Sequence, residues 1–261
     1  MAALRIERTG GVLRIEMDKP DVRNAFDEAM IAELDAAFAM AGEDEQTRVV
    51  VLSGSGKSFS AGADLAWMKR QSEAAEQANL EDARRFTAML HRLASCSKPT
   101  IARVQGACMG GGVGLVCACD FAIAGESARF ATSEARFGIL PSVIAPYLIG
   151  AIGLRQAKRL ALSVAQIDAQ EALSLGLVTA SVPDASLDEA VAALVEQLRT
   201  SGPAAMAAIK TLYPRLAAAG IDSEARELTA QTIARIRATG EAREGFAAFL
   251  EKRPARWTLD D

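Results

Sequence analysis

Two glycine-containing segments carry most of the chemistry that this sequence could support. KSFSAGADLAWM at 57–68 and VQGACMGGGVGLVCACD at 104–120 each follow a predicted strand and precede a predicted helix. Loops of this kind expose backbone N–H groups, which can hold a phosphate or the oxygen of a carbonyl that is acquiring negative charge. The run Gly110–Gly112 lacks the GxGxxG spacing of a dinucleotide-binding loop and the lysine of a P-loop. This favours the carbonyl interpretation, although a triple glycine alone is equally consistent with close packing of a helix on a sheet.

A single glutamate is the candidate proton carrier. Glu134 stands in the segment SEARFG at 133–138, at the start of an apolar stretch that continues to Leu154. A carboxylate beside an apolar pocket tends to have a raised pKa, which suits general acid–base catalysis near neutral pH. An isolated glutamate on a surface loop is more often structural, so the surrounding motifs decide how Glu134 is interpreted.

Regular elements must position these residues, and the sequence predicts both strands and helices. The alternating runs LRIERT and VLRIEM, separated by Gly10 and Gly11, predict an opening β-hairpin. Strands and helices then alternate to about residue 125, which predicts mostly parallel strands covered by helices and hence the α/β class. Apolar residues at helical spacing predict helices at 27–41, 79–95, 187–200, 222–239 and 241–253.

Strand signals fade from about residue 154, so the last third of the chain is predicted to be helical. Ser201-Gly202-Pro203 combines a helix stop with a helix start. We therefore expect a core of residues 1–200 and a helical C-terminal region of residues 201–261.

Composition argues against several functional classes. The formal charge of −4 and pI near 5.3 argue against a nucleic-acid partner. The N-terminal residues lack the apolar region of a secretory signal, so we expect a cytoplasmic protein. The uncharged stretch 137–154 is long enough to raise the question of a membrane helix. Pro141, Pro146 and several glycines interrupt it, which predicts short helices beside an apolar pocket and no membrane association.

The cysteines do not predict a metal site. Cys96, Cys108, Cys117 and Cys119 form no CxxC pair, and the only histidine, His91, stands apart from them in the sequence. We expect free, mostly buried thiols and no zinc.

Three motifs together resemble the crotonase (enoyl-CoA hydratase/isomerase) superfamily. They are SAGADL at 60–65, the segment 106–120 and SEARFG at 133–138, and the likeness extends to EGFAAFLEKRPARW at 244–257. The resemblance implies a crotonase-like spiral core of repeated β-β-α units and an acyl-CoA thioester substrate. It also implies no metal or redox cofactor, with coenzyme A being part of the substrate. The C-terminal helices would build a homotrimer or a dimer of trimers.

The same resemblance assigns roles to individual positions. The backbone N–H groups of Ala63 and Gly111 would form an oxyanion hole for the thioester oxygen, and Glu134 would act on the water that becomes the 3-hydroxyl. The acyl pocket would be lined by Trp67, Met109, Gly114, Arg136 and Ser142. Coenzyme A would lie against Arg23, Ala25, Ala61, Asp64, Leu65, Lys69, Phe249 and Lys252.

One position departs from the family pattern. Hydratases of this superfamily hold water between two glutamates, and the first of these falls on Gly114. The motifs most closely resemble bacterial methylglutaconyl-CoA and isohexenylglutaconyl-CoA hydratases, which favours hydration. A distal substrate carboxylate could then occupy the space left by Gly114, with Arg136 neutralising it. Proton shuttling by Glu134 alone would instead give a 3-enoyl-CoA to 2-enoyl-CoA isomerase. A catalytically silent acyl-CoA or RNA binder is the alternative from another class.

Overall fold

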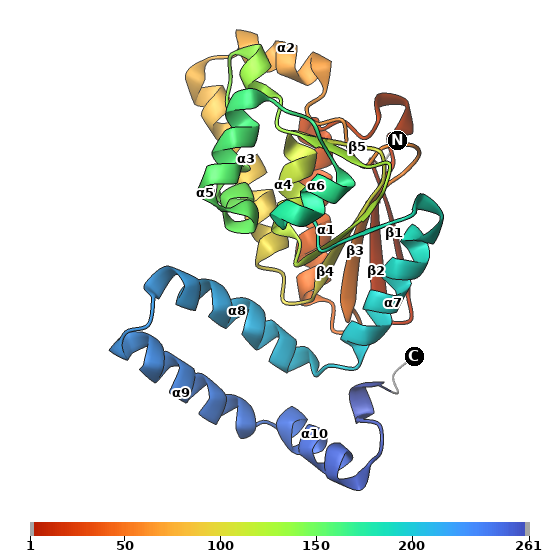
Figure 1. Cartoon of the computed structure of the whole chain (residues 1–261), viewed down its shortest axis with the longest axis vertical. Helices are drawn as coiled ribbons and strands as arrows, with labels where there is room; N and C mark the ends of the chain where they lie inside the picture. Colours follow the sequence, from red (N-terminus) through yellow and green to blue (C-terminus); the bar gives the residue numbers. More distant parts are fainter. Residues whose placement is uncertain (1–2, 259–261) are drawn as a thin grey trace.

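The chain is described by a computed structural model over residues 3–258, with only the backbone for Ala219. Two sheets and their covering helices form the core (Figure 1). The larger sheet has the strand order β1-β2-β3-β4-β6-β9, and the smaller has the order β5-β7-β8. The strands are β1 (Leu4–Thr9), β2 (Val12–Met17), β3 (Val49–Gly54), β4 (Thr100–Val104), β5 (Ala107–Met109), β6 (Phe121–Gly125), β7 (Arg129–Ala131), β8 (Ile167–Asp168) and β9 (Ala180–Val182). The predicted α/β class is confirmed.

Strand direction decides where the loops meet. β1 and β2 form the predicted antiparallel hairpin, and every later neighbour in the larger sheet is parallel. Parallel strands need long crossover connections, which here contain the helices. The carboxyl ends of β3 and β4 consequently lie at one edge, and the two glycine-containing segments follow those ends.

The core repeats a unit of two strands and a helix. β4 and β5 precede α4 (Gly111–Ala118), while β6 and β7 precede α5 (Ala145–Ser163). In both units the first strand joins the larger sheet and the second joins the smaller one. This is the β-β-α repeat that the family resemblance implied. Strands β5, β7, β8 and β9 were not predicted, because two or three residues are too few to show an alternating pattern.

Helices cover both faces of the larger sheet. α1 begins where the Asp27 carboxylate accepts a hydrogen bond from the Met30 N–H at 2.8 Å, and it buries Leu34 and Phe38 in the main core. On the other face, α7 packs Val191 and Val195 against strand residues. The remaining helices are α2 (Leu65–Glu73), α3 (Glu76–Ala94), α6 (Ala169–Leu175), α8 (Pro203–Ala219), α9 (Ser223–Arg237) and α10 (Gly240–Glu251), with α1 at Glu28–Glu43 and α7 at Leu187–Arg199. All five predicted helices are confirmed within a few residues.

The apolar stretch at 137–154 leads into α5. That helix changes direction at Gly153, whose φ of 74° and ψ of 156° are not helical, so two helical pieces meet there. In the part of the chain that the structure describes, no helix combines the length and apolarity needed to cross a membrane.

Helices α8, α9 and α10 form a C-terminal arm that extends from the lower end of the core (Figure 1). Lys210 on α8 pairs with Asp120 and also donates a hydrogen bond to the Lys98 carbonyl. Arg48 Nη1 donates to the Trp257 carbonyl at 2.6 Å. Beyond these contacts, the arm exposes much of its apolar surface, including Ile209, Tyr213, Ile221, Ile233, Phe246, Phe249 and Leu250.

Candidate active site

The two glycine-containing loops lie against each other. The Ser60 N–H donates to the Ala107 carbonyl at 3.0 Å, and the Met109 N–H donates to the Ser60 carbonyl at 2.9 Å. Contact is so close that a β-carbon added to Gly62 would lie 3.1 Å from the Met109 carbonyl oxygen. The φ of +87° at Gly62 also favours glycine. Segments that are nearly fifty residues apart in the sequence thus form one surface.

Ala63 presents its N–H away from the bonds that hold its loop. The Phe26 N–H donates to the Gly62 carbonyl, and the Asp64 N–H donates to the Phe26 carbonyl, each at 2.7 Å. In extended backbone, successive N–H groups point to opposite sides, so the Ala63 N–H is directed away from Phe26. No protein acceptor receives it among the described residues.

Gly111 supplies a second N–H donor. It is the first residue of α4, where the N–H has no acceptor within the helix and the helix dipole favours negative charge. Gly110, at a φ of +50°, turns the chain into this helix. A β-carbon at Gly111 would lie 2.8 Å from Phe86 and 3.2 Å from Phe26, so aromatic rings pack directly against the backbone. The donor consequently stands in a rigid, largely apolar setting.

Glu134 lies next to this helix start. It begins a short 3-10 helix (Glu134–Phe137) that follows β7, and its Oε1 atom would be 3.1 Å from a β-carbon placed on Gly110. Its Oε2 atom is buried and has no hydrogen-bond partner among the described residues. Burial raises the pKa of this carboxyl above its ordinary value of 4.5. A partly desolvated carboxylate with one oxygen free, beside two unused N–H donors, can move a proton while the donors stabilise an oxyanion.

The space beside Gly114 is filled, which corrects one expectation. A β-carbon at Gly114 would overlap the Ile144 Cγ2 atom, lie 2.9 Å from the Ile144 Cβ and 3.6 Å from the Leu90 Cδ1. Ile144 is only 2% exposed. The hypothesis that a substrate carboxylate occupies the space left by Gly114 is therefore wrong, because an apolar side chain already packs there.

Most of the expected coenzyme A positions come together around the first loop. The Ala61 N–H donates to the Arg23 carbonyl at 2.8 Å, which places these two residues side by side. Asp64 has a definite structural role, since its Oδ1 atom accepts from the Trp67 N–H at 2.9 Å and caps α2. Lys69 is exposed farther along α2. The remaining members of this group are the buried Ala25 and the exposed Leu65.

The two expected positions from the C-terminal helix are not brought to this loop within one chain. Phe249 is 81% exposed on α10, and Lys252 ends that helix at a φ of 54°. Figure 1 places α10 and α2 at opposite ends of the longest axis. A single chain does not gather all the expected coenzyme A residues into one site.

The remaining expected pocket positions differ in their surroundings. Trp67 is buried, and its indole N–H has no partner among the described residues. Met109 lies where β5 meets Gly62. Arg136 and Ser142 are exposed, and Arg136 Nη2 donates to the Val164 carbonyl at 3.5 Å, near the end of α5.

The residues that pack beneath the two glycine-containing loops were not predicted from the sequence. Phe26, Phe86 and Ile144 touch the glycine positions, yet each reads in the sequence as an ordinary core residue. Ser60 was noted only as part of a motif, although its hydroxyl bonds within the site. No local pattern could have identified these residues, because their partners are distant in the chain.

Metal and thiol chemistry receive no support from the side chains. Among residues 3–258, no group of three or more histidine, cysteine or acidic side chains is arranged to hold a metal ion. All four cysteines are free, and burial raises the pKa of Cys117 to about 12. A thiol with such a pKa is not a nucleophile at neutral pH.

Comparison with known proteins connects this geometry to one family. The family model described as enoyl-CoA hydratase/isomerase matches residues 7–260. A Thermus thermophilus relative named putative enoyl-CoA hydratase is 35% identical, over 95% of this chain and 98% of its own length. An Escherichia coli relative named 2,3-dehydroadipyl-CoA hydratase is 34% identical, over 97% of each chain. The crystal structure of an enoyl-CoA hydratase from Shewanella pealeana has a TM-score of 0.95 at 40% identity, covering 98% of this chain and 96% of that one.

Proposed function

Because the chain belongs to the enoyl-CoA hydratase/isomerase family, we propose that it is a hydro-lyase that adds water reversibly across the 2,3-double bond of an enoyl-CoA thioester. The observation that carries this proposal is the partly buried Glu134 carboxylate, whose Oε2 atom has no partner among the described residues, beside the loops that bear two unused N–H donors. These groups suit the two needs of the reaction, which are proton transfer and stabilisation of an enolate oxygen.

The chemistry divides between the loops and the carboxylate. The N–H groups of Ala63 and Gly111 donate hydrogen bonds to the thioester oxygen, which makes C3 electrophilic. Glu134 removes a proton from water as the water oxygen bonds to C3, and the electron pair of the double bond moves to the enolate. The protonated Glu134 then gives this proton to C2 as the enolate collapses, so that one water has been added and the carboxylate is regenerated. One N–H donor to the thioester oxygen typically contributes about a hundred- to a thousandfold in rate.

The finer proposal is a branched or carboxylated acyl group, with methylglutaconyl-CoA as the first substrate to test. Its support is the likeness of the motifs and the relative named for 2,3-dehydroadipyl-CoA, a dicarboxylic acyl chain. Since Ile144 fills the space beside Gly114, the proposed partner of a distal carboxylate is the exposed Arg136, two residues after Glu134.

One observation supports an isomerase as the second candidate. Gly114 stands where the family pattern has its first glutamate, and the side chains of Ile144 and Leu90 pack against it. Glu134, which matches the second glutamate, therefore has no carboxylate partner at that position. A single carboxylate can carry a proton between C4 and C2, converting a 3-enoyl-CoA to the 2-enoyl isomer without adding water.

The test is turnover of a panel containing crotonyl-CoA, methylglutaconyl-CoA and a 3-enoyl-CoA, followed by absorbance of the conjugated thioester. Glu134→Gln should lower turnover by about a hundred- to ten-thousandfold, because it keeps the size but loses the ionisable group. Acyl-CoA binding should remain. Wild-type rates in the variant would refute the mechanism, and loss of binding would make Glu134 structural. Isomerisation without any hydration by the wild type would establish the second candidate.

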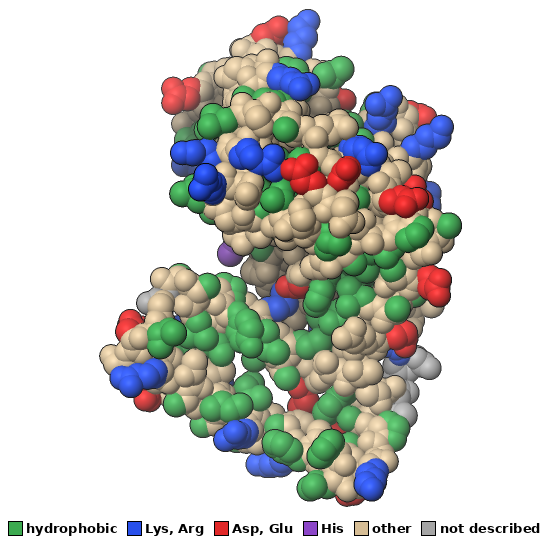
Figure 2. Space-filling model, in the orientation of Figure 1, with side chains coloured by type: hydrophobic (Ala, Val, Ile, Leu, Met, Phe, Trp, Pro, Cys, Tyr) green, Lys and Arg blue, Asp and Glu red, His purple; other side chains and the backbone are tan. Residues whose placement is uncertain are grey.

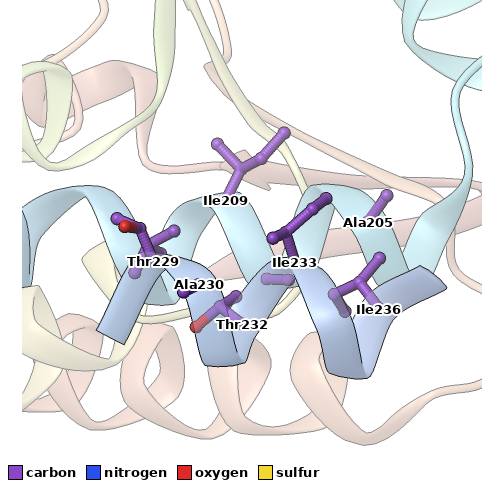
Figure 3. Close-up of a pocket in the computed structure, with 9 residues that line it drawn as sticks. Ala205, Ile209, Thr229, Ala230, Thr232, Ile233 and Ile236 are labelled. Atoms are coloured by element: carbon purple, nitrogen blue, oxygen red, sulfur yellow. The ribbon is translucent and has the colours of Figure 1, made fainter. Parts of the chain in front are cut away.

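We also propose that the C-terminal arm joins copies of this chain into a homotrimer or a dimer of trimers. Between α8 and α9 runs a groove of about 530 Å³ lined by apolar residues such as Ile209, Ile233 and Ile236 (Figure 3). Figure 2 shows hydrophobic side chains gathered over these helices. Exposed apolar surface of this extent is typical of an interface. A neighbouring arm would also bring Phe249 and Lys252 toward a coenzyme A site.

A further inference from the structure

Ser60 is in contact with both segments that carry the N–H donors of the candidate site. Its side chain is fully buried, and its backbone pairs with β5 through Ala107 and Met109. A β-carbon on Gly112 would lie 3.0 Å from the Ser60 Cβ, so Ser60 also touches the first turn of α4. Ser60 therefore joins its own loop, at 57–68, to the second loop, at 104–120.

The Ser60 hydroxyl has defined partners on its own loop. It donates to the Asn24 carbonyl at 2.8 Å and accepts from the Gly62 N–H at 3.2 Å. A serine hydroxyl has one proton to donate, so the bond to Asn24 fixes its orientation and turns a lone pair toward Gly62.

Asn24 is a firm anchor for this hydroxyl. It is fully buried at a φ of 54°, and its Nδ2 group donates to the Ser55 and Ser58 carbonyls at 2.9 Å each. Its Oδ1 atom accepts from the Lys19 N–H, also at 2.9 Å. The residue is thereby held by three separate backbone groups.

The bond from the Gly62 N–H restrains the adjacent donor. Gly62 has no side chain and a positive φ, so its backbone would otherwise turn freely. The Ala63 N–H belongs to the same planar peptide as the Gly62 carbonyl and points in the opposite direction. Two hydrogen bonds hold Gly62, one from its N–H to the Ser60 hydroxyl and one from the Phe26 N–H to its carbonyl. Together they set the direction of the Ala63 N–H.

We propose that Ser60 is a positioning residue whose hydroxyl fixes the Ala63 N–H relative to the Gly111 N–H, and so sets how strongly the thioester carbonyl is polarised. This inference rests on the proposed function, because it takes those two donors as the oxyanion hole. Ser60 itself does not touch the substrate. Its effect is felt in the transition state, where the oxygen carries most charge.

The experiment uses the full-length protein and the probe 2,4-hexadienoyl-CoA, whose absorption moves to longer wavelength when its carbonyl is polarised. Turnover is prevented by measuring the spectra in the Glu134→Gln background. Ser60→Ala should reduce this red shift, and in the Glu134-containing enzyme it should lower kcat about ten- to hundredfold. KM should change by no more than about twofold, because ground-state binding is largely retained.

Ser55→Ala is the matched control. The Ser55 hydroxyl is buried without a partner among the described residues, so its removal should leave kcat and the red shift unchanged. Ser60→Cys, which keeps the shape but hydrogen-bonds weakly, should give an intermediate red shift and provides the test if Ser60→Ala does not fold.

The outcomes separate this inference from the proposed function. An unchanged red shift in Ser60→Ala, whether or not its stability falls, would overturn the positioning role and leave the oxyanion hole intact. No red shift on binding to the Ser60-containing protein would refute the oxyanion hole itself. A reduced red shift with a lowered kcat, but no change with Ser55→Ala, is the expected result.

Discussion

At the scale of single residues, the proposed proton carrier Glu134 has a cost in stability. Its carboxyl is desolvated and one oxygen has no partner among the described residues, so ionisation is disfavoured in the folded chain. The raised pKa means that the folded state binds this proton more tightly than the unfolded state does. Stability from this group is therefore full below about pH 4.5 and is lost as the pH rises through the raised pKa.

Glu134→Gln should consequently make the protein more stable at pH 7, because glutamine carries no charge to desolvate. We expect a gain of no more than about 1 kcal/mol, since the side chain is partly exposed. The gain should disappear below pH 4.5, where the wild-type carboxyl is also protonated. Thermal unfolding of both proteins from pH 4 to pH 8 measures the effect. A constant difference across that range would contradict the assigned pKa direction.

Gly114 and Ile144 act as a fitted pair. Since Ile144 occupies the position of a β-carbon at 114, Gly114→Ala should destabilise the fold by about 1–3 kcal/mol through overpacking. Ile144→Ala should cost about 2–5 kcal/mol by leaving a cavity. In the double variant the new methyl group enters the vacated space, so the combined loss should be smaller than the sum.

A double-mutant cycle by denaturant unfolding measures this coupling. Val113→Ala, combined with Ile144→Ala in a second cycle, is the reference, because the overlap with Ile144 is at position 114. The coupling in that second cycle should be smaller. Strict additivity of Gly114→Ala and Ile144→Ala would show that Ile144 does not fill the site.

At the scale of elements, the loop before α2 is proposed to act through the backbone N–H of Ala63. Ala63→Ser keeps the N–H and should preserve activity within a few fold. Ala63→Pro removes that N–H and should lower kcat by about a hundred- to a thousandfold, the usual contribution of one oxyanion donor. Circular dichroism must show an intact fold in both variants. Equal losses from the two substitutions would count against a backbone role for position 63.

At the scale of the whole molecule, the C-terminal arm has more apolar surface than its contacts with the core cover. Ile233→Asp on α9 should break or weaken the association of copies, because it places a charge in the α8–α9 groove. Light scattering after size-exclusion chromatography reports the mass. Ile6→Asp on the edge strand β1 is a control, since Ile6 is 42% exposed and Ile233 is 46% exposed. A wild-type monomer, or unchanged mass in Ile233→Asp, would refute the proposed interface.

The sequence by itself determined the elements with a long periodic pattern and the identity of the motifs. The hairpin around Gly10 and Gly11 was predicted from local spacing, and so were the helices α1, α3, α7, α9 and α10. Such spacing is a property of each stretch of chain by itself. The family was also readable, because SAGADL and the segment 106–120 occur in the order and loop context that the family uses.

Only the tertiary structure decided how those motifs meet. The short strands β5 and β7 exist because parallel partners hold them, and their two or three residues encode no pattern. Likewise, the sequence shows only that Gly114 replaces a glutamate of the family pattern. In the structure the side chain of Ile144, thirty residues later, fills the space beside Gly114. Contacts between distant residues depend on how the whole chain packs. For that reason the candidate proton carrier Glu134 could be singled out from its motif, while the apolar side chains packed beside Gly114 and the hydrogen bonds of Ser60 could not be predicted.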